Sequence, residues 1–175
     1  MSTAVIERPA SSEYASSYSR YVSAVPEGDV LELLEKQGKD TQAMLRGIDE
    51  KKSRHRYAPG KWSIREVIGH VNDAERVFTY RALRFARGDA TPLPSFDENA
   101  WGDASNADDR TLADHAREMA AIRASTLALF RGFTSEHFAR TGTASGHQIS
   151  VRALAYIVAG HERHHVKILR ERYGI

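Results

Sequence analysis

The sequence contains no cysteine among its 175 residues. This absence excludes disulfide bonds, thiolate ligands to a metal and a cysteine nucleophile. Any bound metal ion must therefore be held by histidine, aspartate or glutamate. The chain also lacks an apolar run of about 18 residues, which a membrane-spanning helix requires, and an apolar N-terminal segment typical of a secretion signal. We expect a cytoplasmic protein that makes no contact with a membrane.

An excess of one sign of charge is also lacking. Lysine and arginine number 25, aspartate and glutamate number 23, and both signs are mixed along every segment. Without a basic stripe, the chain is not expected to bind nucleic acid. Hydrophobic residues make up 41% and charged residues 27%, which is typical of a globular protein. The length suits one domain with its own hydrophobic core.

The chain divides into an N-terminal arm, residues 1–27, and a helical domain, residues 28–175. The arm is rich in serine, tyrosine and proline, and we expect its first dozen residues to be flexible. Tyr14, Tyr18 and Tyr21 are spaced to share one face of a helix. We therefore expect the second half of the arm to pack against the domain.

Four amphipathic segments with helical periodicity make up the domain, and no alternating pattern indicates a β-strand. Each segment begins at a residue able to cap a helix: Asp29, Ser63, Thr111 and Ser150. Acidic residues three positions later predict capping boxes at the first three: Glu32, Glu66 and Asp114. We predict an all-α fold, a four-helix bundle with a long loop between its second and third helices. This loop, residues 88–110, is expected to be functional and to cross the end of the bundle.

The fourth helix is apolar on almost all sides over residues 151–159. A helix of this kind is buried on more than one side. Either other helices and the long loop surround it, or its outer side binds a second subunit. The second possibility leads us to expect a homodimer.

Two histidines, His161 and His165, lie four residues apart in the apolar stripe of this helix. Residues at this spacing share one helical face. A buried polar group without a partner costs about 1–3 kcal/mol, so both rings need partners for their nitrogens. A divalent metal ion would serve both rings at once. The alternative is a pair of core histidines that bind carbonyls or carboxylates.

A third histidine, His70, lies at the edge of the apolar stripe of the second helix and faces a neighbouring helix. Gly69 precedes it as Gly160 precedes His161, and two such glycines would allow close helix approach where the ligands converge. Coincidence is the alternative. Three neutral imidazoles without a fourth protein ligand are typical of an open catalytic site. Imidazole suits several divalent metals, and we expect zinc or nickel, with iron as a further candidate.

The remaining histidines are not expected to bind the metal. Around the helix, His164 points away from the pair, and the others lie in polar or loop contexts typical of the surface: His55, His115, His137 and His147. Glu75 and Glu162 are candidates for orienting an imidazole from behind. The alternative for both glutamates is a solvent-facing carboxylate paired with a nearby arginine.

Four residues in and before the long loop have expected structural roles. Asp97 and Glu98 are candidates for holding the loop in place. Trp62 and Trp101 are expected to pack rather than to stack on a ligand. No residue stands out as a general base.

Three motifs in this order resemble the DinB/YfiT-like superfamily. Trp62-Ser-Ile-Arg-Glu-Val-Ile-Gly-His70 is similar to the family's Trp-Ser/Thr-x-Arg-x-x-x-x-His stretch. Phe96-Asp-Glu-Asn-Ala-Trp101 is similar to the Tyr-Asp-Glu-x-x-Trp loop of the YfiT-like branch, and His161-Glu-Arg-His-His165 to the family's HxxxH pair. The resemblance covers about residues 28–173. It implies a four-helix bundle with a metal site made by His70, His161 and His165.

The resemblance also implies an activity. Members of the family are described as metal-dependent hydrolases, and better understood relatives are thiol S-transferases or isomerases that use bacillithiol or mycothiol. The implied function is a metal-dependent thiol S-transferase or hydrolase that acts on a small electrophilic substrate, with a low-molecular-weight thiol as a possible cofactor. The alternative is a non-catalytic metal-binding bundle that serves as a binding or dimerisation module in a stress response.

Overall fold

The fold is given by a computed structural model that describes residues 6–175. Four long helices form a bundle: α2 (Val30–Arg46), α4 (Ile64–Ala86), α6 (Leu112–Arg131) and α8 (Val151–Tyr173). The expected four-helix bundle is therefore confirmed. No helix in residues 6–175 is long and apolar enough to cross a lipid bilayer.

Each bundle helix begins directly after its expected cap. Side chains at all four caps accept hydrogen bonds from backbone N–H groups of the first turn, and two of them complete reciprocal capping boxes: Ser63 with Glu66, and Thr111 with Asp114. At Asp29 the carboxylate accepts from Leu31 and Glu32, but no return bond from the Glu32 side chain is present in the described chain. The box predicted there is therefore absent, although the helix starts where expected.

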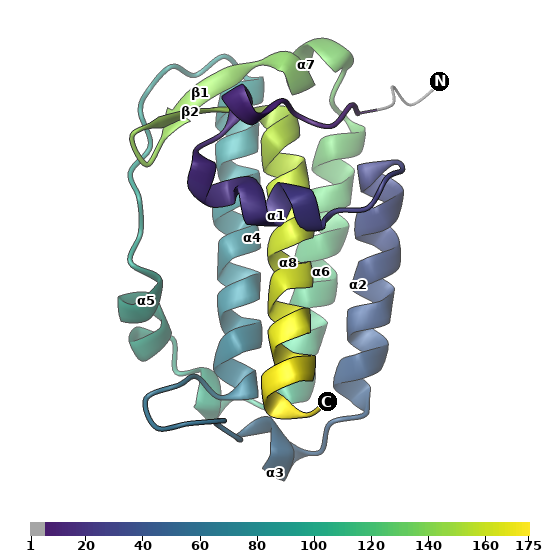
Figure 1. Cartoon of the computed structure of the whole chain (residues 1–175), viewed down its shortest axis with the longest axis vertical. Helices are drawn as coiled ribbons and strands as arrows, with labels where there is room; N and C mark the ends of the chain where they lie inside the picture. Colours follow the sequence, from purple (N-terminus) through teal and green to yellow (C-terminus); the bar gives the residue numbers. More distant parts are fainter. Residues whose placement is uncertain (1–5) are drawn as a thin grey trace.

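The order of the helices around the bundle differs from their order in the sequence. Helix α4 packs against α8 and α6, and α2 packs against α6 and α8, so α2 and α4 lie on a diagonal. Figure 1 shows that the chain between α4 and α6 runs back along the side of the bundle. This segment contains α5 (Glu98–Ala104) and a 3₁₀ turn, Ala107–Asp109. The loop expected to cross the bundle end instead follows its length, so α4 and α6 run in the same direction.

A β-hairpin, which the sequence reading did not predict, lies before α8. Strands β1 (Thr141–Ala144) and β2 (His147–Ser150) are antiparallel, and Leu93 of the long loop pairs beside them through two backbone hydrogen bonds of 2.9 and 3.0 Å. Ser145 and Gly146 join the strands with φ angles of 52° and 78°. Two consecutive positive φ values define the tight turn that best matches the strand twist. The Ser-Gly dipeptide was the available signal, but strands of four residues are too short to show alternation.

Short helices close the bundle at both ends and on one side. They are α3 (Glu50–Ser53), α7 (Ser135–Ala139), α1 (Ser19–Ala24), and two 3₁₀ turns at Ser11–Glu13 and Ser16–Tyr18. Helix α1 packs across α8, as expected for the second half of the arm. Among the first dozen residues, expected to be flexible, Ile6 is buried and Arg8 donates to the carbonyls of Val22 and Val25. The described part of that stretch is therefore anchored at Ile6 and Arg8, and residues 1–5 lie outside the described residues.

The packing of α1 bears on the expected homodimer. Every residue from Val151 to Glu162 except Arg152 is buried within the single chain. The outer side of α8, which led us to expect a second subunit, is thus covered by the chain's own N-terminal arm. The homodimer stays a prediction, now without its original motivating observation.

Gly160 makes the contact between α1 and α8 possible. A Cβ atom at this position would collide with the backbone carbonyl of Tyr21. Gly69 differs, because a Cβ there would lie at an ordinary 3.5 Å from Cβ of Ala107. The two glycines therefore do not bring the ligand-bearing helices together, contrary to the sequence-based idea. Gly160 allows α1 of the N-terminal arm to pack closely on α8, and Gly69 faces the long loop and α6.

This difference predicts opposite effects of the same substitution. Gly160→Ala should lower the free energy of unfolding by about 1–3 kcal/mol, because the added methyl group overpacks the contact with α1. Gly69→Ala should leave it unchanged or raise it by up to about 1 kcal/mol, because alanine favours the helix. Urea denaturation followed by circular dichroism measures both. Equal effects of the two substitutions would contradict the packing of α1 on α8.

A belt of buried polar residues crosses all four bundle helices between two apolar clusters. One cluster lies around Phe78, Phe85 and Leu154, and the other lies around Ile64 and Leu169. The belt between them consists of Gln37, Thr41, His70, Glu75, Arg123, Thr126, His161 and Glu162. Buried polar groups require hydrogen-bond partners or ligands, so the residues of this belt are the first candidates for a functional site.

Candidate metal centre

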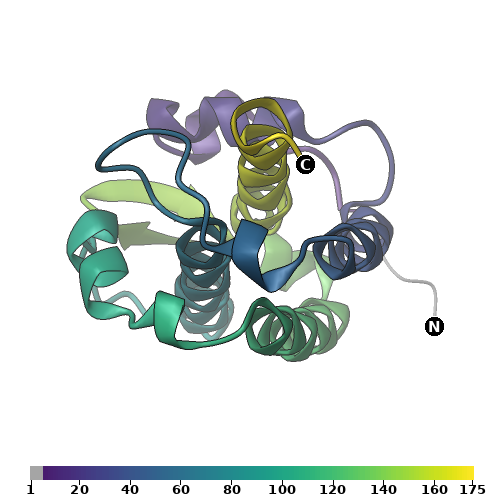
Figure 2. The same ribbon diagram turned by 90° about the horizontal axis from the view of Figure 1, so that it is seen from below.

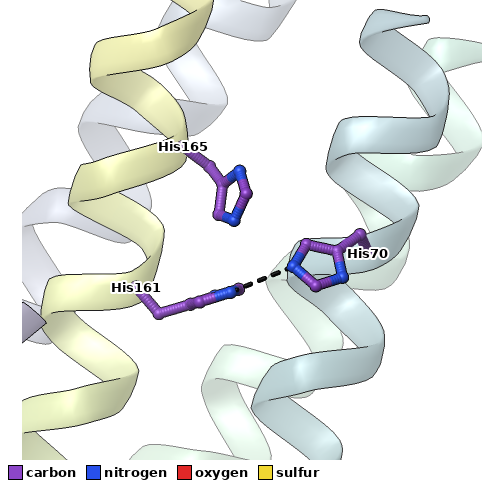
Figure 3. Close-up of side chains that lie close together, drawn as sticks. All are labelled: His70, His161 and His165. Carbon is purple, nitrogen blue, oxygen red and sulfur yellow. Dashed lines mark hydrogen bonds between the residues drawn. The ribbon is translucent and has the colours of Figure 1, made fainter. Parts of the chain in front are cut away.

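Three histidines meet at the level of the polar belt. His70 lies on α4, and His161 and His165 lie one turn apart on the facing side of α8. One ring nitrogen from each lies within 4.8 Å of the other two, and Nε2 of His70 is 3.0 Å from Nε2 of His161. Figure 3 shows the three rings directed into the space between the two helices. The structure thus brings together the three residues singled out from the sequence.

This arrangement fits a divalent metal ion. Nitrogen ligands lie about 2.0–2.1 Å from zinc, so two ligands of a tetrahedral site are about 3.3 Å apart. The 3.0 Å separation of His70 and His161 is close to this value. In the absence of an ion, one of these rings can donate to the other, whereas His165 has no hydrogen-bond partner within residues 6–175. An ion between the rings would satisfy all three nitrogens.

Burial also keeps the rings in the form that binds metal. It lowers the pKa of His70 to about 4 and that of His165 to about 3, with a further contribution to the latter from His70. Burial and the neighbouring His165 hold the pKa of His161 well below its ordinary value. All three rings are therefore neutral near pH 7, and neutral imidazole has the free lone pair that a metal requires.

The other five histidines lie outside this cluster and differ in how far they are buried. His164 packs its ring edge against Tyr21, with the ring centres 5.4 Å apart, and does not belong to the cluster. His55 and His147 are exposed, and His137 is half-buried, broadly as expected. His115 is only 1% exposed, which contradicts its predicted surface position. It lies under the long loop, where its Nε2 is 2.9 Å from the carbonyl oxygen of Ala107.

Glu75 and Glu162 are buried and share one arginine. Arg123 on α6 binds Glu75 at 2.8 Å and Glu162 at 2.7 Å, and all three side chains are at most 6% exposed. The solvent-facing alternative is therefore wrong, although the pairing with an arginine is present. Within residues 6–175, neither carboxylate forms a hydrogen bond with an imidazole. Thr41, Gln37 and Thr126 supply the remaining contacts.

Arg123 is the member of this network that sequence reasoning missed. It lies on the buried side of α6, between Met119 and Leu127, which is where an unpaired charge would be costly. An arginine inside the apolar stripe of the third helix was the available signal. It could have been matched with a carboxylate in the stripe of another helix.

A cavity of about 200 Å³ opens beside the histidines. His70 and His161 line one part of it, and Glu98 of α5 lines it from the long loop. Oε2 of Glu98 lies 4.0 Å from Nε2 of His70, and the Glu98 side chain is 60% exposed. Asp97 caps α5 by accepting from Asn99 and Ala100, so it holds this part of the loop as expected. Glu98 is instead directed at the metal site.

The two tryptophans frame the same region. Trp62 packs against His70, with ring centres 4.9 Å apart, and Gly102 of α5 lies against the indole. Its packing role is confirmed. Trp101 contacts Phe96 but is 44% exposed, so it is only partly packed.

Comparisons with known proteins agree with this fold. The model of the DinB superfamily matches residues 33–169. YfiT from Bacillus subtilis, described as a probable metal-dependent hydrolase with an unusual four-helix bundle topology, is similar in structure with a TM-score of 0.72 and 17% identity. That alignment covers 86% of this chain and 90% of YfiT.

A second similar structure is the mycothiol-dependent maleylpyruvate isomerase, with a TM-score of 0.66 and 14% identity. The alignment covers 81% of this chain and 60% of the isomerase. Among curated proteins, none matches the chain in sequence. At these identities the two structures establish a shared fold, and the match of the family model extends over most of the chain. The chain belongs to the DinB superfamily.

Proposed function

We propose that this protein is a divalent-metal-dependent enzyme, a thiol S-transferase or hydrolase, with the metal held by His70, His161 and His165. The proposal rests on one observation, the convergence of three neutral imidazoles, two of which, His70 and His161, line a small cavity. Three protein ligands leave a coordination position for a reactant, as catalytic sites require. Zinc or nickel is the expected ion, with iron as a further candidate.

Each residue of the site has a distinct task in this proposal. The bound metal would act as a Lewis acid and would favour the deprotonated form of a water or thiol. His70, His161 and His165 would hold it. Glu98 accepts the proton that the nucleophile loses, at Oε2, which lies 4.0 Å from Nε2 of His70. Trp62 covers His70 and keeps bulk water from that side of the site.

The descriptions of the similar structures support a hydrolase and the use of a thiol. YfiT is described as a probable metal-dependent hydrolase, and the isomerase is dependent on mycothiol. The chain has no cysteine, so a thiol reaction would need a low-molecular-weight thiol from outside the protein. We infer a small electrophilic substrate. A cytoplasmic location stays a prediction.

An activity screen of the metal-loaded protein tests this function. Bacillithiol, mycothiol and glutathione are each offered with 1-chloro-2,4-dinitrobenzene, and p-nitrophenyl acetate is offered without a thiol. Activity that disappears with a chelator and returns with the metal supports the proposal. Activity that persists in metal-free protein, or in His161→Ala, contradicts it.

Glu98→Gln should lower kcat by about 10²–10⁴-fold, the usual contribution of a positioned acid or base. The metal content should stay the same, because the glutamate is not one of the three proposed ligands. Asp103→Asn is the matched control, since Asp103 is an exposed carboxylate on the same short helix and does not line the cavity. Unchanged kcat in Glu98→Gln would remove this residue from the mechanism.

A further inference from the structure

Arg81 is a buried arginine that has no carboxylate partner within residues 6–175. Three arginines are buried in residues 6–175, namely Arg65, Arg81 and Arg123. Arg65 pairs with Glu50, and Arg123 pairs with two glutamates. Arg81 is only 2% exposed, yet in the described chain no carboxylate oxygen lies within 4.0 Å of it. Among the buried guanidinium groups of residues 6–175, that of Arg81 is the one whose charge is not paired with a carboxylate of the protein.

The contacts of Arg81 hold it in place and leave part of it free. Nη2 donates to the carbonyl of Pro94 at 2.8 Å and to Oγ of Ser145 at 3.1 Å. Both acceptors are neutral, and no hydrogen bond from Nε or Nη1 occurs within residues 6–175. Ser145 lies in the hairpin turn with a φ of 52°, an uncommon conformation for a residue other than glycine. The long loop and the hairpin thus orient the guanidinium through neutral oxygens.

Arg81 lines the same cavity as the histidines. His70, Ala74, Phe78 and Arg81 follow one another along one face of α4, and all four line the cavity. Eleven residues separate His70 from Arg81, which is about 16 Å along a helix, and the arginine side chain leans back toward the N-terminus. Along its α4 wall the cavity therefore has a histidine end, an apolar middle made by Ala74 and Phe78, and a cationic end.

The remaining charged residues of the cavity do not balance Arg81. Arg20 and Glu98 are its other charged lining residues, and both are exposed. A buried charge without a partner is strongly unfavourable, so an arginine kept in this position indicates a negatively charged ligand group. The planar guanidinium suits a carboxylate or a similar oxyanion.

We propose that Arg81 determines specificity by binding the anionic end of a small, elongated substrate or thiol whose reacting group lies at the histidines. This proposal rests on the proposed function for the position of the reacting group. The ligand class that follows is a molecule with a terminal carboxylate, a short apolar segment and a thiol or electrophilic centre at the other end. A cavity of about 200 Å³ limits it to a small molecule.

Binding of a matched pair of probes tests this role. Isothermal titration calorimetry compares 6-mercaptohexanoate with its neutral amide, on metal-loaded and on chelator-treated protein. The wild type should bind the carboxylate about tenfold or more tightly than the amide, as expected for a charge-assisted hydrogen bond. Arg81→Gln should lose this preference, and Arg81→Lys should keep part of it.

Controls separate this inference from the proposed function and from misfolding. Arg84→Gln on the same helix removes an arginine that is paired with Asp89 and does not line the cavity, so it should keep the preference. Metal content and thermal melts are measured for every variant. Absence of metal in the wild type would contradict the proposed function alone, because the chelator-treated protein still reports the preference. Equal binding of both probes by the wild type, or an unchanged preference in folded Arg81→Gln, would overturn the role of Arg81 even with the metal present.

Discussion

His161→Ala is expected to reduce the bound metal from about one ion per chain to a small fraction, because a three-ligand site cannot hold its ion tightly with two. His161 lies close to both of the other histidines. Its Nε2 lies 3.0 Å from that of His70, and its ring centre lies 4.5 Å from that of His165. Elemental analysis of protein loaded with zinc or nickel and then dialysed measures the effect.

His164→Ala is the matched control for this experiment. It removes an imidazole from the same turn of α8 that packs against Tyr21 and does not belong to the cluster. Its metal content should equal that of the wild type. His70→Ala should behave like His161→Ala, although the two residues are 91 positions apart in the sequence. Full metal content in His161→Ala would show that His161 does not hold the ion and that the assigned site is wrong.

Arg123→Met is expected to lower the free energy of unfolding by about 3–5 kcal/mol. Arg123 is the only basic residue that pairs with Glu75 or Glu162 in the described chain, and both carboxylates are at most 4% exposed. Methionine keeps much of the side-chain volume but leaves two buried carboxylates without a cation. Urea denaturation at pH 7 measures the loss of stability.

Two further variants identify the charge as the cause. Arg131→Met removes an exposed arginine of the same helix that pairs with Glu35, and such a pair contributes at most about 1 kcal/mol. The triple variant Arg123→Met, Glu75→Gln, Glu162→Gln removes the two negative charges as well, and it should recover part of the lost stability. If the triple variant is less stable than Arg123→Met, the effect comes from packing and not from buried charge.

The local features of the fold were readable because they depend on neighbours in the sequence. A capping box such as Ser63 with Glu66 needs only residues three positions apart, and all four bundle helices start at their expected caps. His161 and His165 share a helical face for the same reason. The hairpin at Ser145 escaped detection because its strands are too short to establish a period of two.

Contacts between distant segments were not readable in this way. Arg123 lies 48 residues from Glu75 and 39 from Glu162, and no local pattern links the three. Glu98 is an ordinary residue of a loop until the loop folds back along the bundle and places it beside His70. The role of Gly160 was also unreadable from the sequence. Only the position of the Tyr21 backbone in the structure shows which segment packs against this glycine.

By itself, the sequence determined that this protein is a helical bundle and which three histidines are candidates for one site. Periodicity, caps and the spacing of two imidazoles on one helix are properties of single helices. They can be recognised without knowing which helices pack against each other. Only the tertiary structure decided that α1 covers α8, that Glu75 and Glu162 pair with Arg123, and that Arg81 lines the cavity with no carboxylate partner in the described chain. Burial and pairing of charges depend on which helices become neighbours, and in this bundle that order differs from the order of the chain.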